Sequence, residues 1–434
     1  MDKKNAPNLM DKIVSLCKRR GFVFPGSEIY GGLANSWDYG PLGVELKNNI
    51  KQAWWKMFVQ DREDMVGLDS ALIMNVKVWE KSGHLDNFSD PLVECEKCHQ
   101  RFREDQLTTK ACPACTGKLS PAKQFNLMLK TFLGPAEESA NVSYLRPETA
   151  QGIFVNFKNI ADTTRKKPPF GVGQIGKAFR NEITPGNFIF RTREFEQMEI
   201  EYFIPEPKND LEWQAEFERW RLAILDWIKY LGVDTKKEIH ELNVPKEKLA
   251  HYSKKTIDFE YGFPFGRDEL CGLAYRTDFD LKKHSLEYTD GEGNKYVPHV
   301  IEPSLGVDRS LLAALCSAYH EEELDKETRI VLRLPKYLAP IKIAVFPLLK
   351  NKEQLVARAK EVFNLLKKDF VCEFDDNGNV GKRYRRQDEI GTPYCVTIDF
   401  DTLDNGTVTV RDRDTMEQAR IKIVDLLPYF HQNI

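Results

Sequence analysis

The middle of the chain alternates short β-forming stretches with a turn that no helix can absorb. Phe190, Phe195, Ile200 and Tyr202 lie in stretches rich in β-forming residues, and Pro185-Gly186 interrupts the run. Proline removes a backbone donor and glycine permits turn conformations, so this pair marks a reversal of direction. The region therefore predicts an antiparallel sheet.

Two amphipathic helices are expected beside this sheet. Apolar residues between 44 and 58 recur at near-helical spacing, with Lys and Asn between them. A longer stripe runs from Trp213 to Leu231 and stops at Gly232, where a helix C-cap is expected. Both stripes predict core packing.

Three glycines, Gly171, Gly173 and Gly176, match the letters of a dinucleotide-binding fingerprint. That fingerprint requires a buried strand before the glycines and a crossover helix after them. Here the charged run 165–169 (RKKPP) precedes them, and Pro185-Gly186 follows within 10 residues. We therefore expect no nicotinamide or flavin cofactor at this place.

Composition excludes several classes of protein. The 434 residues suffice for two or three domains, and 41% hydrophobic with 30% charged residues is typical of a globular chain. The net charge of -3 requires that any polyanion bind through a local basic patch. The most apolar stretch, 311–316, is far shorter than the roughly 20 residues of a membrane span. Since residues 1–21 also lack the apolar core of a secretory signal, we expect a cytoplasmic protein without membrane contact.

Four of the nine cysteines form two pairs, Cys95-x-x-Cys98 and Cys112-x-x-Cys115, with 13 residues between the pairs. In a reducing compartment this spacing predicts four thiolates around a structural Zn²⁺, with His99 as a bystander. Four ordinary thiols are the alternative. The segment 94–119 is charged and interrupts the surrounding pattern, so it is expected to form a small inserted, zinc-ribbon-like module.

The pattern changes after Leu334-Pro335 to an alternation of strand and helix. The expected elements are a strand at 341–345, a helix at 352–368, a strand at 371–374 and a hairpin-like stretch at 394–410 turned at Asn405-Gly406. This alternation predicts a separate α/β domain over 340–434 that follows a larger domain over 1–335.

Charged side chains gather around the predicted central turn. Arg180 and Glu182 precede it, and Arg191, Arg193 and Glu194 follow it. A planar guanidinium binds two phosphate oxygens at once, and nearby carboxylates can hold Mg²⁺ or an ammonium group. On a pleated hairpin these groups would share one sheet face that suits a triphosphate. A solvated hairpin with cross-strand salt bridges is the alternative.

Longer motifs connect these residues to a family. The segment 179–182 (FRNE) resembles motif 2 of the class II aminoacyl-tRNA synthetases, and 306–313 (GVDRSLLA) resembles their motif 3. Four further matches narrow the resemblance to the homodimeric glycyl-tRNA synthetases. They are 37–43 (WDYGPLG), 144–152 (YLRPETAQG), 276–281 (RTDFDL) and 300–304 (VIEPS).

The resemblance, which spans nearly the whole chain, implies both fold and reaction. The fold would be α+β: a class II antiparallel catalytic sheet flanked by helices, the zinc-ribbon-like insertion, and a C-terminal α/β anticodon-binding domain. The chain would form a homodimer, bind ATP with Mg²⁺, convert glycine to glycyl-adenylate and transfer glycine to the 3′ end of tRNA(Gly). No covalent nucleophile is needed, because phosphoryl transfer depends on positioning and charge stabilisation.

The resemblance also assigns catalytic and ATP-binding residues. Arg180 would hold the α-phosphate and Arg309 the γ-phosphate. Phe195 would stack on the adenine, Glu182 would bind its amino group, and Glu269 would hold Mg²⁺. The expected ATP-binding set is Arg180, Asn181, Glu182, Phe190, Arg191, Thr192, Arg193, Glu194, Phe195, Glu269, Leu270, Gly306, Val307, Asp308 and Arg309.

For glycine, selectivity has to come from polar capture in a pocket too small for a methyl group, because every competing amino acid is larger. By resemblance, carboxylates would face the ammonium group. The expected glycine-binding set is Arg103, Glu148, Phe195, Glu196, Gln197, Met198, Glu199, Glu302, Pro303, Ser304, Leu305 and Gly306. Arg103 would reach in from the inserted module, which would give the zinc a role; a surface ribbon unrelated to catalysis is the alternative.

In the C-terminal domain, the run 382–386 (KRYRR) places four cations and an aromatic ring together. Such a run suits phosphate contact and base stacking on unpaired RNA, and a solvated charged loop is the alternative.

Two other functions compete with glycine–tRNA ligation. A class II synthetase for threonine, proline or histidine is disfavoured by the glutamate-rich pocket and by 301–304 (IEPS). A non-catalytic paralogue that binds RNA or nucleotides as a regulator is disfavoured because both Arg180 and Arg309 are present.

Overall fold

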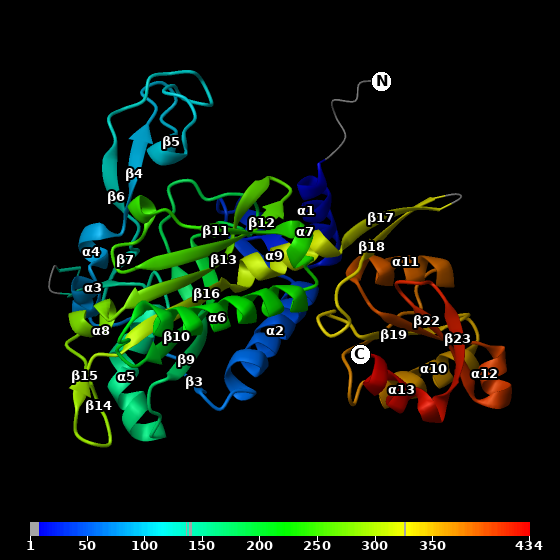
Figure 1. Ribbon diagram of the computed structural model, residues 1–434. Helices are drawn as coiled ribbons and strands as arrows, with labels where there is room; N and C mark the ends of the chain where they lie inside the picture. The colour runs from blue at the N-terminus through cyan, green and yellow to red at the C-terminus, as the bar shows by residue number, and fades with distance from the viewer. Residues whose placement is uncertain (1–7, 136, 139–140, 325–326) are drawn as a thin grey trace.

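The computed structural model describes residues 8–135, 137–138, 141–324 and 327–434. Its centre is a seven-stranded sheet in the order β11-β12-β13-β16-β10-β9-β3 (Figure 1). The strands are β11 (Ile239–Asn243), β12 (Lys255–Phe263), β13 (Gly266–Thr277), β16 (His299–Gly306), β10 (Glu194–Ile204), β9 (Phe170–Phe179) and β3 (Met65–Gly67). All neighbours run antiparallel except β3 and β9. The predicted antiparallel sheet is confirmed.

The turn between β9 and β10 is wider than the sequence predicts. β9 ends at Phe179 and β10 begins at Glu194, so the charged residues between them lie on a loop rather than on a pleated face. Within this loop, Gly186 and Arg191 exchange backbone hydrogen bonds of 3.0 and 3.2 Å. The apolar residues between those two, among them Phe190, fold back into the core, and this burial keeps the segment from extending the strands.

Glycines 171, 173 and 176 belong to β9 and precede no crossover helix. Each lies where another side chain crosses the strand. A Cβ on Gly173 would be 2.7 Å from Val59 Cγ2, and one on Gly176 would be 2.1 Å from Arg146 Nη2. Close packing, and not a pyrophosphate, accounts for these glycines.

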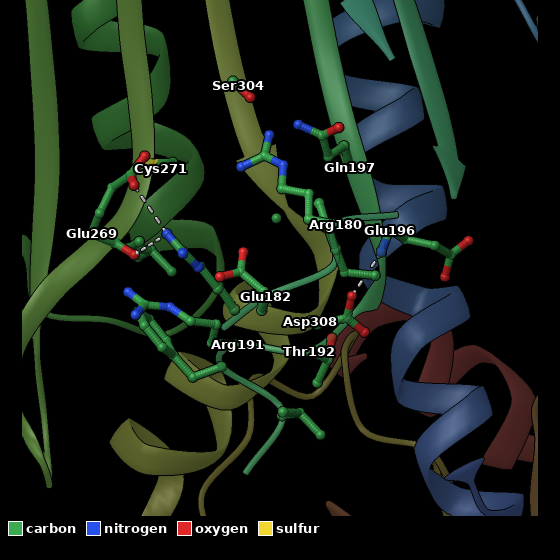
Figure 2. Close-up of a pocket in the computed structure, with 16 residues that line it drawn as sticks. Arg180, Glu182, Arg191, Thr192, Glu196, Gln197, Glu269, Cys271, Ser304 and Asp308 are labelled. Atoms are coloured by element: carbon green, nitrogen blue, oxygen red, sulfur yellow. Dashed lines mark hydrogen bonds and ion pairs between the residues drawn. The ribbon is translucent and has the colours of Figure 1, made fainter. Parts of the chain in front are cut away.

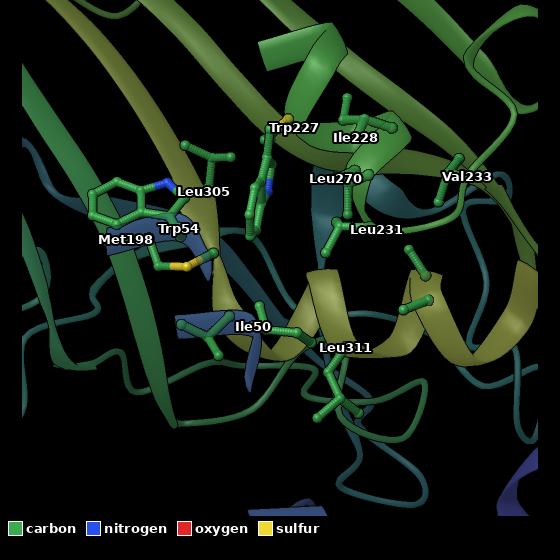
Figure 3. Packing of buried hydrophobic residues seen from close by; sticks show 14 of the residues in the cluster. Ile50, Trp54, Met198, Trp227, Ile228, Leu231, Val233, Leu270, Leu305 and Leu311 are labelled. Carbon is green, nitrogen blue, oxygen red and sulfur yellow. The ribbon is translucent and has the colours of Figure 1, made fainter. Parts of the chain in front are cut away.

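Both predicted amphipathic helices are present and pack on one face of the sheet. They are α2 (Pro41–Trp55), which continues as a π-helical turn to Gln60, and α6 (Asp210–Tyr230). As expected, Gly232 follows α6 in the left-handed region, with φ of 87°. Ile50, Trp54 and Trp227 are fully buried in the resulting core (Figure 3). Val44 is exposed instead, because it lies off the stripe that faces the sheet.

Two more helices complete that layer, α1 (Leu9–Arg20) and α9 (Val307–Ala318). The opposite sheet face carries α5 (Ala150–Thr164) and α8 (Phe279–Lys283), whose apolar side chains pack around Phe203. These helices cover one end of that face and leave the start of β10 open, which is where the candidate site lies.

A small three-stranded sheet projects from the body of the molecule (Figure 1). It is formed by β4 (Ser89–Glu94), β5 (Arg101–Arg103) and β6 (Lys123–Asn126), and it follows α3 (Val76–Ser82) and α4 (His84–Asn87). It contains the paired cysteines of the predicted insertion. The remaining short elements are β1 (Val23–Pro25), β2 (Trp37–Tyr39), β7 (Lys130–Phe132), β8 (Val142–Tyr144), α7 (Thr235–Glu238), β14 (Tyr288–Thr289) and β15 (Lys295–Tyr296).

The C-terminal part contains a separate five-stranded sheet in the order β20-β19-β21-β22-β23. It follows a hairpin of β17 (Tyr319–Leu324) and β18 (Glu327–Leu332). Its elements are β19 (Ile343–Pro347), α10 (Glu353–Leu366), β20 (Cys372–Phe374), α11 (Val380–Ile390), β21 (Tyr394–Ile398), α12 (Phe400–Asn405), β22 (Thr407–Asp412), β23 (Gln418–Lys422) and α13 (Leu426–Asn433).

The predicted hairpin at 394–410 is wrong in one respect. Its two strands do pair antiparallel, but α12 connects them. Asp399 and Thr402 form a capping box at the start of this helix, and Gly406 ends it with φ of 71°. Asn405-Gly406 is thus a helix end rather than a hairpin turn.

The basic run 382–386 lies on α11, where most of it faces protein. Arg383 is 1% exposed and donates to backbone carbonyls, including that of Gly378 at 2.8 Å. Arg385 pairs with Glu327 and Arg386 with Asp375. Because acids outside the run already neutralise these two cations, the predicted contact of the whole run with RNA is not supported.

Buried ion pairs join α11 to the rest of the molecule. Asp388 accepts hydrogen bonds from Arg329 of β18 at 2.8 Å and from Arg411 of β22 at 2.9 Å. Burial alone would raise the pKa of Asp388, but these two guanidinium groups lower it below its ordinary value. The carboxylate therefore stays charged and links α11 to β18 and β22.

No helix within the described ranges is both long and apolar enough to span a bilayer.

Replacement of Asp388 by Asn should destabilise the fold by about 3–5 kcal/mol, because it leaves the buried guanidinium of Arg411 without its acid and Arg329 with Glu322 alone. The difference in unfolding free energy between wild type and variant should be full above about pH 4. It should shrink at lower pH, where the wild-type carboxylate also takes up a proton. Urea unfolding followed by circular dichroism at several pH values measures this. The exposed pair of Asp401 and Arg420 provides the control, since Asp401→Asn should have little effect. An equal effect of both variants would contradict the assignment.

Candidate active site

A cleft lies on the open part of the sheet face, between the loop 180–193 and the start of α9 (Figure 2). Eleven of the predicted ATP-binding residues line it: Arg180, Glu182, Phe190, Arg191, Thr192, Phe195, Glu269, Leu270, Gly306, Asp308 and Arg309. Arg193 and Glu194 line a neighbouring hollow instead, Val307 is buried in the core, and Asn181 lies beside the cleft without lining it. Residues from three segments that are distant in the sequence are thus brought together.

Arg180 extends into the cleft between Ser304 and Gln197 (Figure 2). Its Nε donates to the carbonyl of Pro147 at 3.0 Å. The guanidinium carbon lies 5.3 Å from the centre of the Phe195 ring and 5.4 Å from that of Phe88. Two aromatic rings and a carbonyl therefore hold this cation in place.

Arg309 lies on the other side of the cleft, at the start of α9. Its Nη1 donates to the backbone oxygen of Glu269 at 2.8 Å and to the Glu269 carboxylate at 3.1 Å. Its guanidinium carbon lies 4.3 Å from the centre of the Phe190 ring. Burial and the charge of Glu269 raise the pKa of neighbouring Asp258 to about 7. The cation and several acids thus share one wall.

One carboxylate oxygen of Glu182 is free to accept a hydrogen bond from a ligand. Within the described part of the chain, its Oε2 is buried and has no hydrogen-bond partner. A buried acceptor in a cleft is costly unless a ligand supplies a donor. This atom therefore suits an amino group.

Asp308 lines the cleft, but its carboxylate is held by groups of the fold. It accepts hydrogen bonds from the hydroxyl of Tyr39, from Lys47 Nζ at 2.8 Å and from the backbone nitrogen of Glu196 at 2.8 Å. Sequence analysis missed Lys47, although this buried cation lies one turn from Ile50 on the apolar stripe of α2.

Several residues of the predicted glycine set point away from the cleft. Met198 and Leu305 are buried in the core below the sheet, as is Pro303, because alternate residues of a strand face opposite sides. Glu196 contributes to the cleft lining, but its carboxylate points away from the cleft (Figure 2) and pairs with Lys47 at 2.8 Å and with Lys51. The side chains of these four residues therefore point away from the cleft, and their assignment to glycine stays a prediction.

The other predicted acids, Glu148, Glu199 and Glu302, are buried beyond Ser304. Ser304 Oγ donates to Glu199 at 3.0 Å, and Arg276 Nη1 donates to Glu302 at 2.6 Å. Burial raises the pKa of Glu302 to about 8, and it also raises that of Glu199. The result is a dense acidic floor next to the cleft.

Arg276 was missed as a site residue. It is 1% exposed and pairs with both Glu302 and Asp280, the latter at 2.8 Å. Its spacing of four residues from Asp280, inside the motif at 276–281, was the available signal.

Arg103 lies outside the cleft lining. It pairs with Asp90 at 2.9 Å and with Asp105 at 2.8 Å, at the base of the projecting sheet. Gln106, three residues further along, accepts a hydrogen bond from Nη1 of the cleft residue Arg191 at 3.4 Å, so this segment lies beside the cleft entrance.

The four paired cysteines meet at the tip of the projecting sheet. The sulfur atoms of Cys95 and Cys115 are 3.5 Å apart, and those of Cys98 and Cys112 are 3.6 Å apart. All four lie within 4.8 Å of one another. Backbone N–H groups of Cys98 and Lys97 lower the pKa of Cys95 to about 6, whereas desolvation and the neighbouring thiols raise the pKa of Cys98 to about 12. The donor set fits a tetrahedral zinc ion.

Comparisons with known proteins agree with this geometry. Residues 135–318 match the family described as "tRNA synthetase class II core domain (G, H, P, S and T)", and residues 342–433 match "Anticodon binding domain".

The chain is 55% identical to a protein of Acetivibrio thermocellus named "Glycine--tRNA ligase", over 97% of each chain. A protein of the same name from Lachnospira eligens is 55% identical over 97% of this chain and 98% of its own length. One from Bacillus thuringiensis is 52% identical over 98% of this chain and 99% of its own. With a class II core, an anticodon-binding domain and this identity over nearly its full length, the chain belongs to the glycine–tRNA ligase family of class II synthetases.

Proposed function

We propose that this chain activates glycine with ATP and transfers it to tRNA(Gly), with Arg180 and Arg309 as the catalytic residues. The observation that carries this proposal is the meeting of two guanidinium groups, from segments more than a hundred residues apart, in one cleft on an antiparallel sheet. The cleft also offers Phe195 for stacking and the unoccupied acceptor of Glu182 for an amino group. A non-catalytic regulator is not favoured, since near-full-length relatives are named as ligases.

In the proposed reaction a glycine carboxylate oxygen attacks the α-phosphorus of ATP, and pyrophosphate leaves. Arg180 stabilises the charge that builds up on the α-phosphate, and Arg309 holds the γ-phosphate so that the leaving group lies in line. Bound Mg²⁺ would neutralise phosphate charge, and Glu269, with Asp258 beside it, is the candidate to hold it. The Arg309–Glu269 ion pair then rearranges when ATP binds.

Glycine is proposed to lie between Arg180 and the acidic floor. Glu148, Glu199 and Glu302 would surround its ammonium group, with Ser304 nearby. The floor is packed tightly, because all three acids are less than a tenth exposed. A larger amino acid would have to displace buried, hydrogen-bonded side chains, which costs more than a methyl group contributes.

The rest of the molecule is proposed to serve tRNA. Residues 1–335 would form the catalytic domain with the insertion 94–119, and 340–434 would bind the anticodon of tRNA(Gly). We further propose a homodimer that acts in the cytoplasm.

We also propose that Cys95, Cys98, Cys112 and Cys115 hold a structural Zn²⁺. Four thiolates leave no open coordination position, so the ion would support the fold of the projecting sheet. That sheet carries Arg103 at its base, near the cleft entrance.

Amino-acid-dependent exchange of pyrophosphate with ATP tests the proposed reaction. We expect exchange with glycine and none with alanine, serine, threonine, proline or histidine. Exchange with one of these instead of glycine, or with no amino acid, would refute the assignment.

Replacing either Arg180 or Arg309 by Ala should lower the exchange rate by about 10²–10³ or more, because each removes a fixed positive charge from the transition state. Circular dichroism should show an unchanged fold, since both side chains line an open cleft. Arg358→Ala, which removes an exposed cation of α10, is the control and should retain full activity. A variant at Arg180 or Arg309 with normal activity would disprove the role given to that residue.

Metal analysis should find about one zinc per chain, and a strong chelator should remove it. Removal should raise the KM for glycine more than the KM for ATP, because the projecting sheet carries Arg103 next to the cleft. Cys112→Ser should act like the chelator, and Cys372→Ser, which alters a cysteine outside the cluster, should not. A metal-free protein with unchanged KM for glycine would show that the module is unrelated to catalysis.

A further inference from the structure

Two polar side chains behind the acidic floor, Ser82 and His84, have no role in the proposed reaction and lead to the floor residue Glu148. Ser82 Oγ lies 2.7 Å from Nδ1 of His84. Nε2 of the same ring lies 3.4 Å from Oε2 of Glu148. All three residues are buried. An imidazole thus connects a hydroxyl to the carboxylate proposed to bind glycine.

The ionised Glu148 carboxylate can only accept, so the ring nitrogen that faces it, Nε2, carries a hydrogen. In the neutral ring Nδ1 then has a free lone pair and accepts from the Ser82 hydroxyl. In the protonated ring, Nδ1 donates to Ser82, whose own hydrogen can pass to the carbonyl of Trp79, 3.4 Å away. In both forms Nε2 presents a hydrogen to Glu148.

The ring and its backbone are fixed on several sides. Trp79 and Phe88 pack against the imidazole with centroid distances of 5.5 and 5.3 Å. Asn126 donates from Nδ2 to the carbonyls of His84 at 3.0 Å and Leu85 at 2.9 Å. Asn126 lies on β6, at the base of the projecting sheet, so that module also supports this ring.

Each carboxylate oxygen of Glu148 has its own partner. Oε2 faces Nε2 of the His84 ring, and Oε1 faces a second donor. Its Oε1 accepts from Nε2 of Gln151 at 3.2 Å. Burial alone would raise the pKa of Glu148. The charge of His84 and the hydrogen bond that it donates lower this pKa, and the charge of Arg276 lowers it further. The carboxylate therefore stays ionised and has little rotational freedom, although it is enclosed.

We propose that His84 is a positioning residue for glycine binding, which holds the Glu148 carboxylate in the orientation that captures the ammonium group and does not itself touch the substrate. This inference rests on the proposed function, because it assumes that Glu148 meets glycine. It adds a residue outside the cleft lining to the set that determines affinity for the amino acid.

Three replacements of His84 test this in the glycine-dependent exchange reaction. Leu removes both polar ring positions. Asn retains a group near Nδ1, and Gln retains an amide donor near Nε2. The Leu and Asn variants should raise the KM for glycine about tenfold, as expected when a hydrogen bond to a charged group is lost. Their KM for ATP and their kcat should stay within about twofold of the wild type. The Gln variant should restore the KM for glycine.

His240→Leu is the matched control, since His240 also pairs with a glutamate, Glu260 at 3.1 Å, but on an exposed strand. It should leave all constants unchanged. If the Leu variant of His84 does not fold, the Asn and Gln variants alone decide, because both retain polarity and differ in which ring nitrogen they replace.

Wild-type protein without glycine-dependent exchange would overturn the proposed function itself. With wild-type exchange intact, three results would each overturn the role of His84: an unchanged KM for glycine in the Asn variant, a parallel rise in the KM for ATP, or equal effects of Asn and Gln.

Discussion

The alternation of side chains along β10 and β16 determines how this molecule combines a core with a site. Met198 and Leu305 point to the helices on one side of the sheet, whereas Gln197 and Ser304 point to the cleft on the other. A shift of one residue in pairing would exchange the two sets, bury the polar residues among tryptophans and expose the core. The register Glu199 to Ser304 is therefore required by burial as well as by the site.

A buried ionic cluster reinforces this register. Asp308, at the start of α9, contacts Lys47 of α2 and the backbone of Glu196 on β10. This cluster thereby holds three elements together: α9, which carries Arg309, α2, which carries the apolar stripe, and β10, which forms part of the cleft floor. Such a cluster tolerates the loss of a partner poorly, because each buried charge depends on the others.

Sequence patterns predicted the features that depend on local spacing. The antiparallel sheet, the stripe of α6 that stops before Gly232 and the four cysteines were all anticipated. Arg180 and Arg309 were assigned from motifs that resemble a family, and the structure brings both to one cleft. Features that depend on distant partners were not accessible. The cations of α11 were assigned to RNA because the acids that neutralise them, Glu327 and Asp375, lie outside the run, and only the folded chain brings them to it. The burial of Glu196 against Lys47 and the link between His84 and Glu148 were missed for the same reason.

The segment that connects the seven-stranded sheet to the C-terminal sheet is packed against the rest of the protein. Leu334 and Leu338 of the connecting segment are fully buried in the larger core, and Asp388 ties α11 to β18 across the junction. These buried contacts fix the distance between the cleft and the C-terminal sheet. An RNA that engages both ends must therefore match that length by its own shape, so discrimination can begin with molecular dimensions before a base is read.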